Sequence, residues 1–186
     1  MSNKAAFFDR DGVINEDHGF VSSWKDFEYK KNIKKYLRII QDNGYLIFIV
    51  TNQSGIARGL YTESKFLSLT SSIEKDLKRS NIFIKETFYC PHHPQGSIKK
   101  YSKSCNCRKP KPGMILEAKE KYNLNLKDSV LFGDKFSDYE AAKSAGIGSI
   151  FIMNSKYTSD QPNKIKLYDC LKHPLEILLE ISNEKS

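Results

Sequence analysis

The stretch FFDRDGVIN, residues 7–15, decides the fold. Two phenylalanines lead directly into Asp9 and Asp11, which is typical of a buried strand that stops at a pair of carboxylates. In an open α/β sheet, ligands bind just beyond the carboxyl ends of the strands. An extended backbone would place both carboxylates on one side, and Gly12 then lets the chain turn sharply at little steric cost. The stretch therefore predicts a functional site at the end of a strand.

The carboxylates of Asp9 and Asp11 would repel each other unless a cation lies between them. Mg²⁺ takes oxygen ligands and keeps room for the phosphate of a substrate. The pair therefore favours metal-assisted chemistry on a phosphate. Asp-x-Asp-Gly is also common in solvated turns, and the apolar lead-in is the reason to prefer a site.

Apolar runs alternate with segments of helical periodicity along the chain. The apolar runs predict strands at residues 4–8, 45–50, 86–89, 129–132 and 149–153. Apolar residues at helical spacing predict helices at residues 33–40, 62–77, 113–122, 138–145 and 175–181. This alternation predicts an α/β fold with a doubly wound, mostly parallel sheet. A chain of 186 residues fits one domain, spanning residues 1–186.

Polar side chains also follow other predicted strands. Thr51 ends the second apolar run, and Asp134 follows the fourth. Because the carboxyl ends of parallel strands share one edge of a sheet, we expect both to lie in one cleft with Asp9 and Asp11. Asp134 is the better candidate for a metal ligand, whereas Asp138 either caps or orients the helix that follows. For Thr51 an ordinary turn with a helix cap is an equally good interpretation.

The net charge of +8 comes from lysines that are spread over the whole sequence. This distribution favours attraction of an anionic substrate over a nucleic-acid partner. The sequence has no N-terminal signal pattern and no apolar stretch near the length of a membrane span. We therefore expect a cytoplasmic monomer without a nucleic-acid or membrane partner. The alternative from a different class is a zinc-stabilised nucleic-acid-binding module, which would leave the acidic motifs unexplained.

Three of the four cysteines, Cys90, Cys105 and Cys107, share one irregular segment with His92 and His93. In a cytoplasmic protein such clustering favours a metal over disulfides. Three thiolates and one imidazole complete a tetrahedral structural zinc site, with His92 as the expected fourth ligand and His93 as the alternative. A structural zinc contributes on the order of 10 kcal/mol to a segment that has few apolar residues. The other interpretation is a flexible loop with free thiols.

Arg108 and Lys109 end this zinc-binding loop, which spans about residues 90–109. A loop fixed by zinc can aim both cations at the active site. The lysine ammonium suits the reacting phosphoryl group, and the planar guanidinium suits substrate oxygens or a second phosphate. From the residues alone the favoured interpretation is that both are simply exposed, as basic residues before prolines often are; the functional interpretation depends on the resemblance described next.

The series DRDG at residues 9–12, TN at 51–52 and GD at 133–134 resembles the motifs of the haloacid dehalogenase-like phosphohydrolases. The match covers nearly the whole chain and implies their Rossmann-like fold. It also implies Asp9 as a nucleophile that becomes phosphorylated and Asp11 as a general acid and base. The implied catalytic set is Asp9, Asp11, Thr51, Arg108 and Lys109, and the implied Mg²⁺ ligands are Asp9, Asp11 through its backbone carbonyl, and Asp134. Val13 departs from the pattern, because many members have a threonine there.

Within that superfamily, the segments DRDGVIN, DHGF, TNQSGIARG, CPHHPQG, CNCRKPKPGM and GDK are similar to those of the heptose bisphosphate phosphatases. These members have a zinc loop and no large cap domain, and they act on a sugar bisphosphate in heptose synthesis for lipopolysaccharide or other surface glycans. The resemblance implies substrate contacts at Asp17, His18, Gly19, Phe20, Thr51, Asn52, Gln53, Ser54, Arg108, Lys109 and Lys135. Histidinol-phosphate phosphatase is the nearest enzyme alternative, and the preferred anomer stays open.

Overall fold

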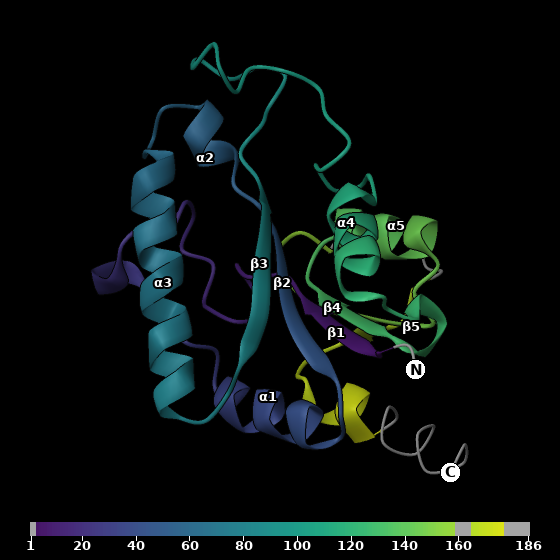
Figure 1. The fold of residues 1–186 in the computed structure, drawn as a ribbon. Helices are drawn as coiled ribbons and strands as arrows, with labels where there is room; N and C mark the ends of the chain where they lie inside the picture. The colour runs from purple at the N-terminus through teal and green to yellow at the C-terminus, as the bar shows by residue number, and fades with distance from the viewer. Residues whose placement is uncertain (1–2, 159–164, 177–186) are drawn as a thin grey trace.

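Six strands form one sheet in the order β3-β2-β1-β4-β5-β6, and every neighbouring pair is parallel (Figure 1). The computed structural model describes residues 3–158 and 165–176. The strands are β1 (Ala5–Phe8), β2 (Leu46–Asn52), β3 (Ile84–Cys90), β4 (Val130–Gly133), β5 (Ser149–Met153) and β6 (Leu167–Tyr168). The predicted parallel sheet is confirmed. The sequence missed β6, which has two residues and lies in a polar stretch.

Helices cover both faces of the sheet (Figure 1). They are α1 (Ile33–Asp42), α2 (Ser54–Ala57), α3 (Glu63–Arg79), α4 (Gly113–Tyr122) and α5 (Phe136–Ala145), with 3-10 turns η1 (Trp24–Asp26) and η2 (Leu126–Asp128). Side chains alternate along β1, so that Phe8 packs in the core with α1 and α3 while Phe7 packs in the core with α4 and α5. All of β1 and β4 is buried, as expected for strands covered on both faces.

The helix boundaries follow local signals in the sequence. Thr62 is the N-cap of α3, and its hydroxyl accepts a hydrogen bond from the backbone N–H of Lys65 at 3.1 Å. Gly146 ends α5 in a left-handed conformation, with φ of +84°. Of the predicted last helix, residues 175 and 176 belong to a helical stretch that begins at residue 172, and the remainder lies outside the described residues.

The order in which consecutive strands are added to the sheet reverses direction between β1 and β4, and ligands bind at such a point in α/β sheets. The path β1-β2-β3 runs outward in one direction and β4-β5-β6 in the other, so the switch point lies between β1 and β4. Two long connections border this edge: residues 9–32 between β1 and α1, and residues 91–112 between β3 and α4. No cap domain covers it within residues 3–158 and 165–176. No helix in these ranges is long and apolar enough to span a membrane.

Candidate active site and metal-binding clusters

Three buried carboxylates meet at the switch point of the sheet. Asp9 follows β1, Asp134 follows β4, and Asp138 lies in the first turn of α5. Each offers a carboxylate oxygen within 4.8 Å of the others. The sequence predicted Asp9 and Asp134 together, and the structure adds Asp138. Three buried carboxylates this close together need cations near them, because like charges repel strongly where there is little water to screen them.

Lys109 supplies one cation from the end of the 91–112 segment. Its ammonium lies 2.9 Å from Asp9 Oδ1 and 2.6 Å from Asp138 Oδ1, and it donates to the carbonyl of Val50 at 2.8 Å. The side chain is 3% exposed, so these contacts are shielded from water. Lys135 supplies a second, more exposed cation, 3.6 Å from Asp134 Oδ1. Lys109 therefore orients two of the three acids.

The surroundings shift the pKa values of Asp9 and Asp134 in opposite directions. Burial works to raise the pKa of Asp9, but the charges of Lys109 and Lys135 hold it below the ordinary value. Burial, together with the charge of Asp9, raises the pKa of Asp134 to about 8. For Lys109 burial lowers the pKa, but Asp138 and Asp9 outweigh it and keep the pKa above its usual range. In the metal-free protein Asp9 is thus an ionised carboxylate and Asp134 holds a proton at neutral pH.

Oxygen donors in this cluster suit a divalent cation. Asp134 Oδ1 is buried and has no hydrogen-bond partner. Gly12 turns next to it with φ of +97°, and a Cβ there would lie 2.1 Å from Asp134 Oδ2. Only glycine fits both the conformation and the space. A hard cation would coordinate this oxygen, which has no hydrogen-bond donor, and would displace the proton of Asp134.

Asp138 resolves a question that the sequence left open. Its Oδ2 accepts hydrogen bonds from the backbone N–H groups of Asp134 at 3.1 Å and Lys135 at 3.0 Å. Its other oxygen contacts Lys109. The residue therefore caps the start of α5 and also orients the lysine of the site.

Asp11 lies outside the three-acid cluster. Its carboxylate accepts hydrogen bonds from Arg10 Nη2 at 2.8 and 2.9 Å, from Asn15 at 3.1 Å and from Gln53 at 3.0 Å. Arg10 is 1% exposed and also donates to the carbonyl of Val21 at 2.7 Å. These donors fix the carboxylate in one orientation. The sequence could have indicated Arg10, because it stands between the two acids.

Gln53 connects Asp11 to the end of β2. Its amide nitrogen donates to Thr51 Oγ1 at 2.9 Å as well as to Asp11, and its carbonyl accepts from the hydroxyl of Tyr61 at 2.5 Å. Asn52 instead makes two bonds to the backbone of Lys109, at 3.0 and 3.1 Å. Tyr61 had no signal in the sequence, because only folding brings it next to Gln53.

A cavity of about 330 Å³ opens beside these residues. It is lined by Asp11, Asp17, Gly19, Phe20, Asn52, Gln53, Ser54, Tyr61, Arg108, Lys109, Lys135, Ser137 and Tyr157. Most of the predicted substrate contacts thus lie in one place. Thr51 is buried beneath Gln53. Arg108 also donates to the carbonyl of His92 at 3.3 Å, which ties it to the cysteine segment.

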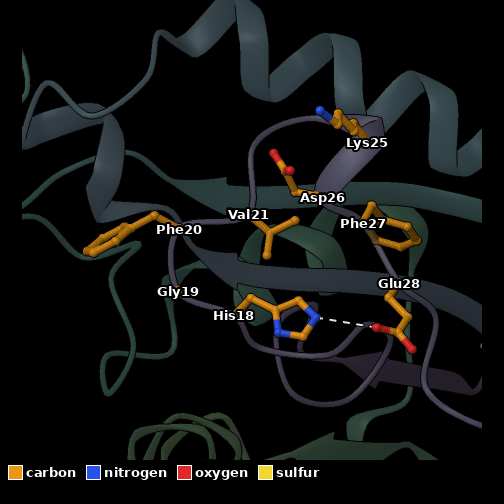
Figure 2. Close-up of a pocket in the computed structure, with 8 residues that line it drawn as sticks. All are labelled: His18, Gly19, Phe20, Val21, Lys25, Asp26, Phe27 and Glu28. Atoms are coloured by element: carbon orange, nitrogen blue, oxygen red, sulfur yellow. Dashed lines mark ion pairs between the residues drawn. The ribbon is translucent and has the colours of Figure 1, made fainter.

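His18 does not line this cavity. It lines an adjacent pocket of about 490 Å³ formed by residues 18–21 and 25–28, and this pocket shares Gly19 and Phe20 with the cavity. Figure 2 shows its imidazole directed toward Glu28, at 3.4 Å, while the Phe20 ring points away from both. Of residues 17–20, only His18 is therefore absent from the lining of the cavity that holds most of the predicted substrate contacts.

The cysteine segment gathers four potential ligands. The Sγ atom of Cys105 lies 3.4 Å from that of Cys90 and 3.1 Å from that of Cys107. His92 Nδ1 lies 3.4 Å from Cys107 Sγ and 3.7 Å from Cys90 Sγ. Ligands of a tetrahedral zinc lie roughly 3.3–3.8 Å apart, given metal–ligand distances of about 2.0–2.3 Å. The arrangement is compatible with a closed structural zinc site.

His93 lies outside this group. Its Nε2 is 3.0 Å from Arg58 Nη2, and its Nδ1 accepts from the backbone N–H of Gln95 at 3.2 Å. Both ring nitrogens therefore have partners away from the thiols. The geometry favours His92 as the fourth member of the cluster.

Comparisons with known proteins agree with this geometry. The family model described as polynucleotide kinase 3 phosphatase matches residues 4–179. A Photorhabdus laumondii protein named D-glycero-alpha-D-manno-heptose-1,7-bisphosphate 7-phosphatase is 44% identical over 161 residues, which cover 87% of this chain and 88% of that protein. A Vibrio cholerae protein named D-glycero-beta-D-manno-heptose-1,7-bisphosphate 7-phosphatase is 42% identical over 162 residues, 87% of each chain.

Two solved structures are similar over almost the full length. The D,D-heptose 1,7-bisphosphate phosphatase from B. bronchiseptica, complexed with magnesium and phosphate, has a TM-score of 0.81 at 26% identity and covers 96% of this chain and 99% of its own. A putative phosphatase of the haloacid dehalogenase-like type from Mesorhizobium loti has a TM-score of 0.84 at 28% identity, covering 98% of this chain and 87% of its own. The chain therefore belongs to the polynucleotide kinase 3 phosphatase family of haloacid dehalogenase-like phosphatases, and it is a phosphoric monoester hydrolase akin to the heptose 1,7-bisphosphate 7-phosphatases.

Proposed function

We propose that the protein removes the 7-phosphate of D-glycero-D-manno-heptose 1,7-bisphosphate in a magnesium-dependent reaction through an aspartyl phosphate on Asp9. The observation that carries this proposal is the buried cluster in which Asp9, held by Lys109, lies beside Asp134 at the switch point. Relatives at 44% and 42% identity bear the name of this activity.

Asp9, Asp134 and the backbone carbonyl of Asp11 would hold Mg²⁺, and the unpartnered Oδ1 of Asp134 is the group that most needs it. Bound there, Mg²⁺ would neutralise the charge that develops on the phosphoryl oxygens. The similar structure from B. bronchiseptica, which contains magnesium and phosphate, supports magnesium as the metal.

Asp9 would attack phosphorus in line, because Lys109 orients its carboxylate and keeps it ionised. A bond forms between Asp9 and phosphorus as the bond between phosphorus and the sugar oxygen breaks. Asp11, which enters this step as the carboxylic acid, gives its proton to that oxygen and becomes a carboxylate. Asp11 then takes a proton from the water that hydrolyses the acyl phosphate. Thr51 and Lys109 would hold the transferring oxygens. Since unaided hydrolysis of phosphate monoesters is extremely slow, most of the acceleration must come from such positioning and electrostatics.

Arg108, Lys135 and the residue 17–20 loop line the outer part of the cavity and would bind the rest of the substrate. The planar guanidinium of Arg108 suits the second phosphate. We further propose that Cys90, His92, Cys105 and Cys107 bind a structural zinc, which would hold Arg108 in place. A cytoplasmic monomer acting in nucleotide-activated heptose synthesis for lipopolysaccharide or surface glycans fits this role.

The decisive experiment measures magnesium-dependent phosphate release from both anomers of the heptose bisphosphate, with histidinol phosphate and fructose 1,6-bisphosphate alongside. Asp9→Asn is the control, and it should abolish turnover while leaving the fold intact. Preference for one heptose anomer would support the proposal and identify that anomer, a useful result because the relatives' names include both. Preference for histidinol phosphate would refute the substrate and keep the mechanism. Full activity in Asp9→Asn would refute the mechanism.

A further inference from the structure

The turn after β5 contacts two elements that line the cavity. Tyr157 donates its hydroxyl to Asp17 Oδ2 at 2.8 Å, and the ammonium of Lys135 lies 4.4 Å from the centroid of its ring. Lys156 donates to the backbone carbonyl of Asp17 at 3.1 Å. Asp17 follows β1 and Lys135 follows β4. One tyrosine therefore contacts two predicted substrate-binding residues, with its hydroxyl and with its ring face.

This turn is itself firmly held. Ser155 Oγ donates to the backbone carbonyl of Asp134 at 2.6 Å and accepts from the N–H of Tyr157 at 3.1 Å. Thr158 Oγ1 accepts from the N–H of Ser155 at 2.9 Å. Tyr157 thus projects from a turn that is fixed to the acid cluster, and a rigid support is what allows a side chain to position another group.

The residue 17–20 loop, in contrast, has an unfavourable backbone. Gly19 has φ of +81° and Phe20 has φ of +53°, and Phe20 is 51% exposed. A bulky residue with positive φ carries local strain that contacts elsewhere must offset. Asp17 supplies such contacts, because its Oδ1 accepts from the N–H of Gly19 at 2.9 Å while Oδ2 accepts from Tyr157. The hydrogen bond from Tyr157 therefore helps to hold Asp17, and through Asp17 the backbone of Gly19, in place.

We propose that Tyr157 is a positioning residue that holds the residue 17–20 loop and Lys135 at the mouth of the cavity, where they bind the part of a sugar bisphosphate outside the transferred phosphoryl group. This inference rests on the proposed function. Tyr157 lines the same cavity as Asp17 and Lys135. Removing its hydroxyl therefore changes a surface that the substrate would contact. The acid cluster lies deeper and keeps its own contacts with Lys109.

The test compares Tyr157→Phe with Tyr122→Phe. Phenylalanine keeps the ring and removes only the hydroxyl. Tyr122 is a matched control, since its hydroxyl also donates to a carboxylate, that of Glu86 at 2.7 Å, but from α4 and outside the cavity. Both variants are assayed on the heptose bisphosphate and on p-nitrophenyl phosphate, whose small leaving group has neither a sugar nor a second phosphate. Amide hydrogen exchange is measured over residues 17–20.

In Tyr157→Phe, KM for the sugar bisphosphate should rise about tenfold, the loss expected for one hydrogen bond to a charged acceptor. Its kcat should change less than about twofold, because the loop binds ground state and transition state alike. Activity on p-nitrophenyl phosphate should not change, and residues 17–20 should exchange faster. Tyr122→Phe should match the wild type in every measurement.

Equal losses on both substrates, or an unchanged KM with unchanged exchange, would overturn the inference. If the wild type hydrolyses p-nitrophenyl phosphate with dependence on Asp9 but ignores the heptose bisphosphate, the proposed function fails separately. The exchange comparison then decides the role of Tyr157, since faster exchange supports it and equal exchange refutes it.

Discussion

Replacing Lys109 with methionine tests the electrostatic balance of the acid cluster. Its ammonium lies 2.9 Å from Asp9 Oδ1 and 2.6 Å from Asp138 Oδ1, and all three side chains are at most 5% exposed. Methionine keeps an unbranched apolar side chain of similar length and removes the charge. Lys135, with a side chain that is 31% exposed, would remain as the other cation near the acids.

Removing one partner of a buried ion pair costs about 3–5 kcal/mol, because the remaining charge stays desolvated. For a chain of this size, each kcal/mol lowers Tm by roughly 2–4 °C. We therefore expect Tm of Lys109→Met to fall by about 6–20 °C in buffer without magnesium. Added Mg²⁺ should recover part of this loss, because a divalent cation at the same carboxylates replaces the missing charge. Turnover should be lost in both conditions.

Thermal and urea unfolding of the wild type and the variant, with and without Mg²⁺, measure the effect. Lys121→Met is the matched control, since Lys121 forms an ion pair of 2.7 Å with Glu86 on the surface, where such pairs contribute at most about 1 kcal/mol. Adding Asp138→Asn to Lys109→Met removes one unpaired charge while keeping an oxygen acceptor, and it should restore part of the stability. If Lys109→Met is no less stable than Lys121→Met without magnesium, the ion pairs do not stabilise the site as argued.

Three other variants or conditions probe the metal sites and the buried acids. Gly12→Ala should abolish magnesium-dependent activity, because the new Cβ would lie 2.1 Å from Asp134 Oδ2; phosphate release and magnesium titration measure this. In magnesium-free buffer the free energy of unfolding should fall as pH rises from about 4 to 8, because the folded state raises the pKa of Asp134 to about 8 and favours its protonated form; urea titrations measure the slope. Cys105→Ser should release zinc and lower Tm strongly, since structural zinc contributes on the order of 10 kcal/mol; metal analysis and thermal unfolding measure both effects.

Each of these has a control in the same chain. Gly146→Ala strains another positive-φ glycine in open space, so it should cost some stability and leave activity intact. Asp134→Asn should flatten part of the pH dependence, since burial raises the pKa of Asp138 as well, and an unchanged slope would exclude Asp134 as a source. Cys170→Ser alters an exposed cysteine and should keep zinc and Tm at wild-type levels. Equal zinc content in Cys105→Ser would contradict the proposed site.

The sequence by itself determined the sheet and the edge at which the site lies. Continuous apolar runs are long enough to specify buried strands, and a parallel sheet brings their carboxyl ends to one edge regardless of side-chain detail. That is why the order of strands and acidic residues along the chain was enough to place Asp9 and Asp134 together. The clustering of cysteines within one segment likewise predicted a metal-binding loop, because those residues are close in the chain.

Only the tertiary structure decided which side chains meet across elements. Lys109 contacts Val50, which is 59 positions away, and Tyr157 contacts Asp17, which is 140 positions away. Neither contact can be recognised from a local pattern in the sequence, because each depends on how segments that follow different strands pack against each other. The choice between His92 and His93 has the same origin. Neighbouring histidines are chemically equivalent in the sequence, and the backbone between β3 and α4 directs one toward the thiols and the other toward Arg58.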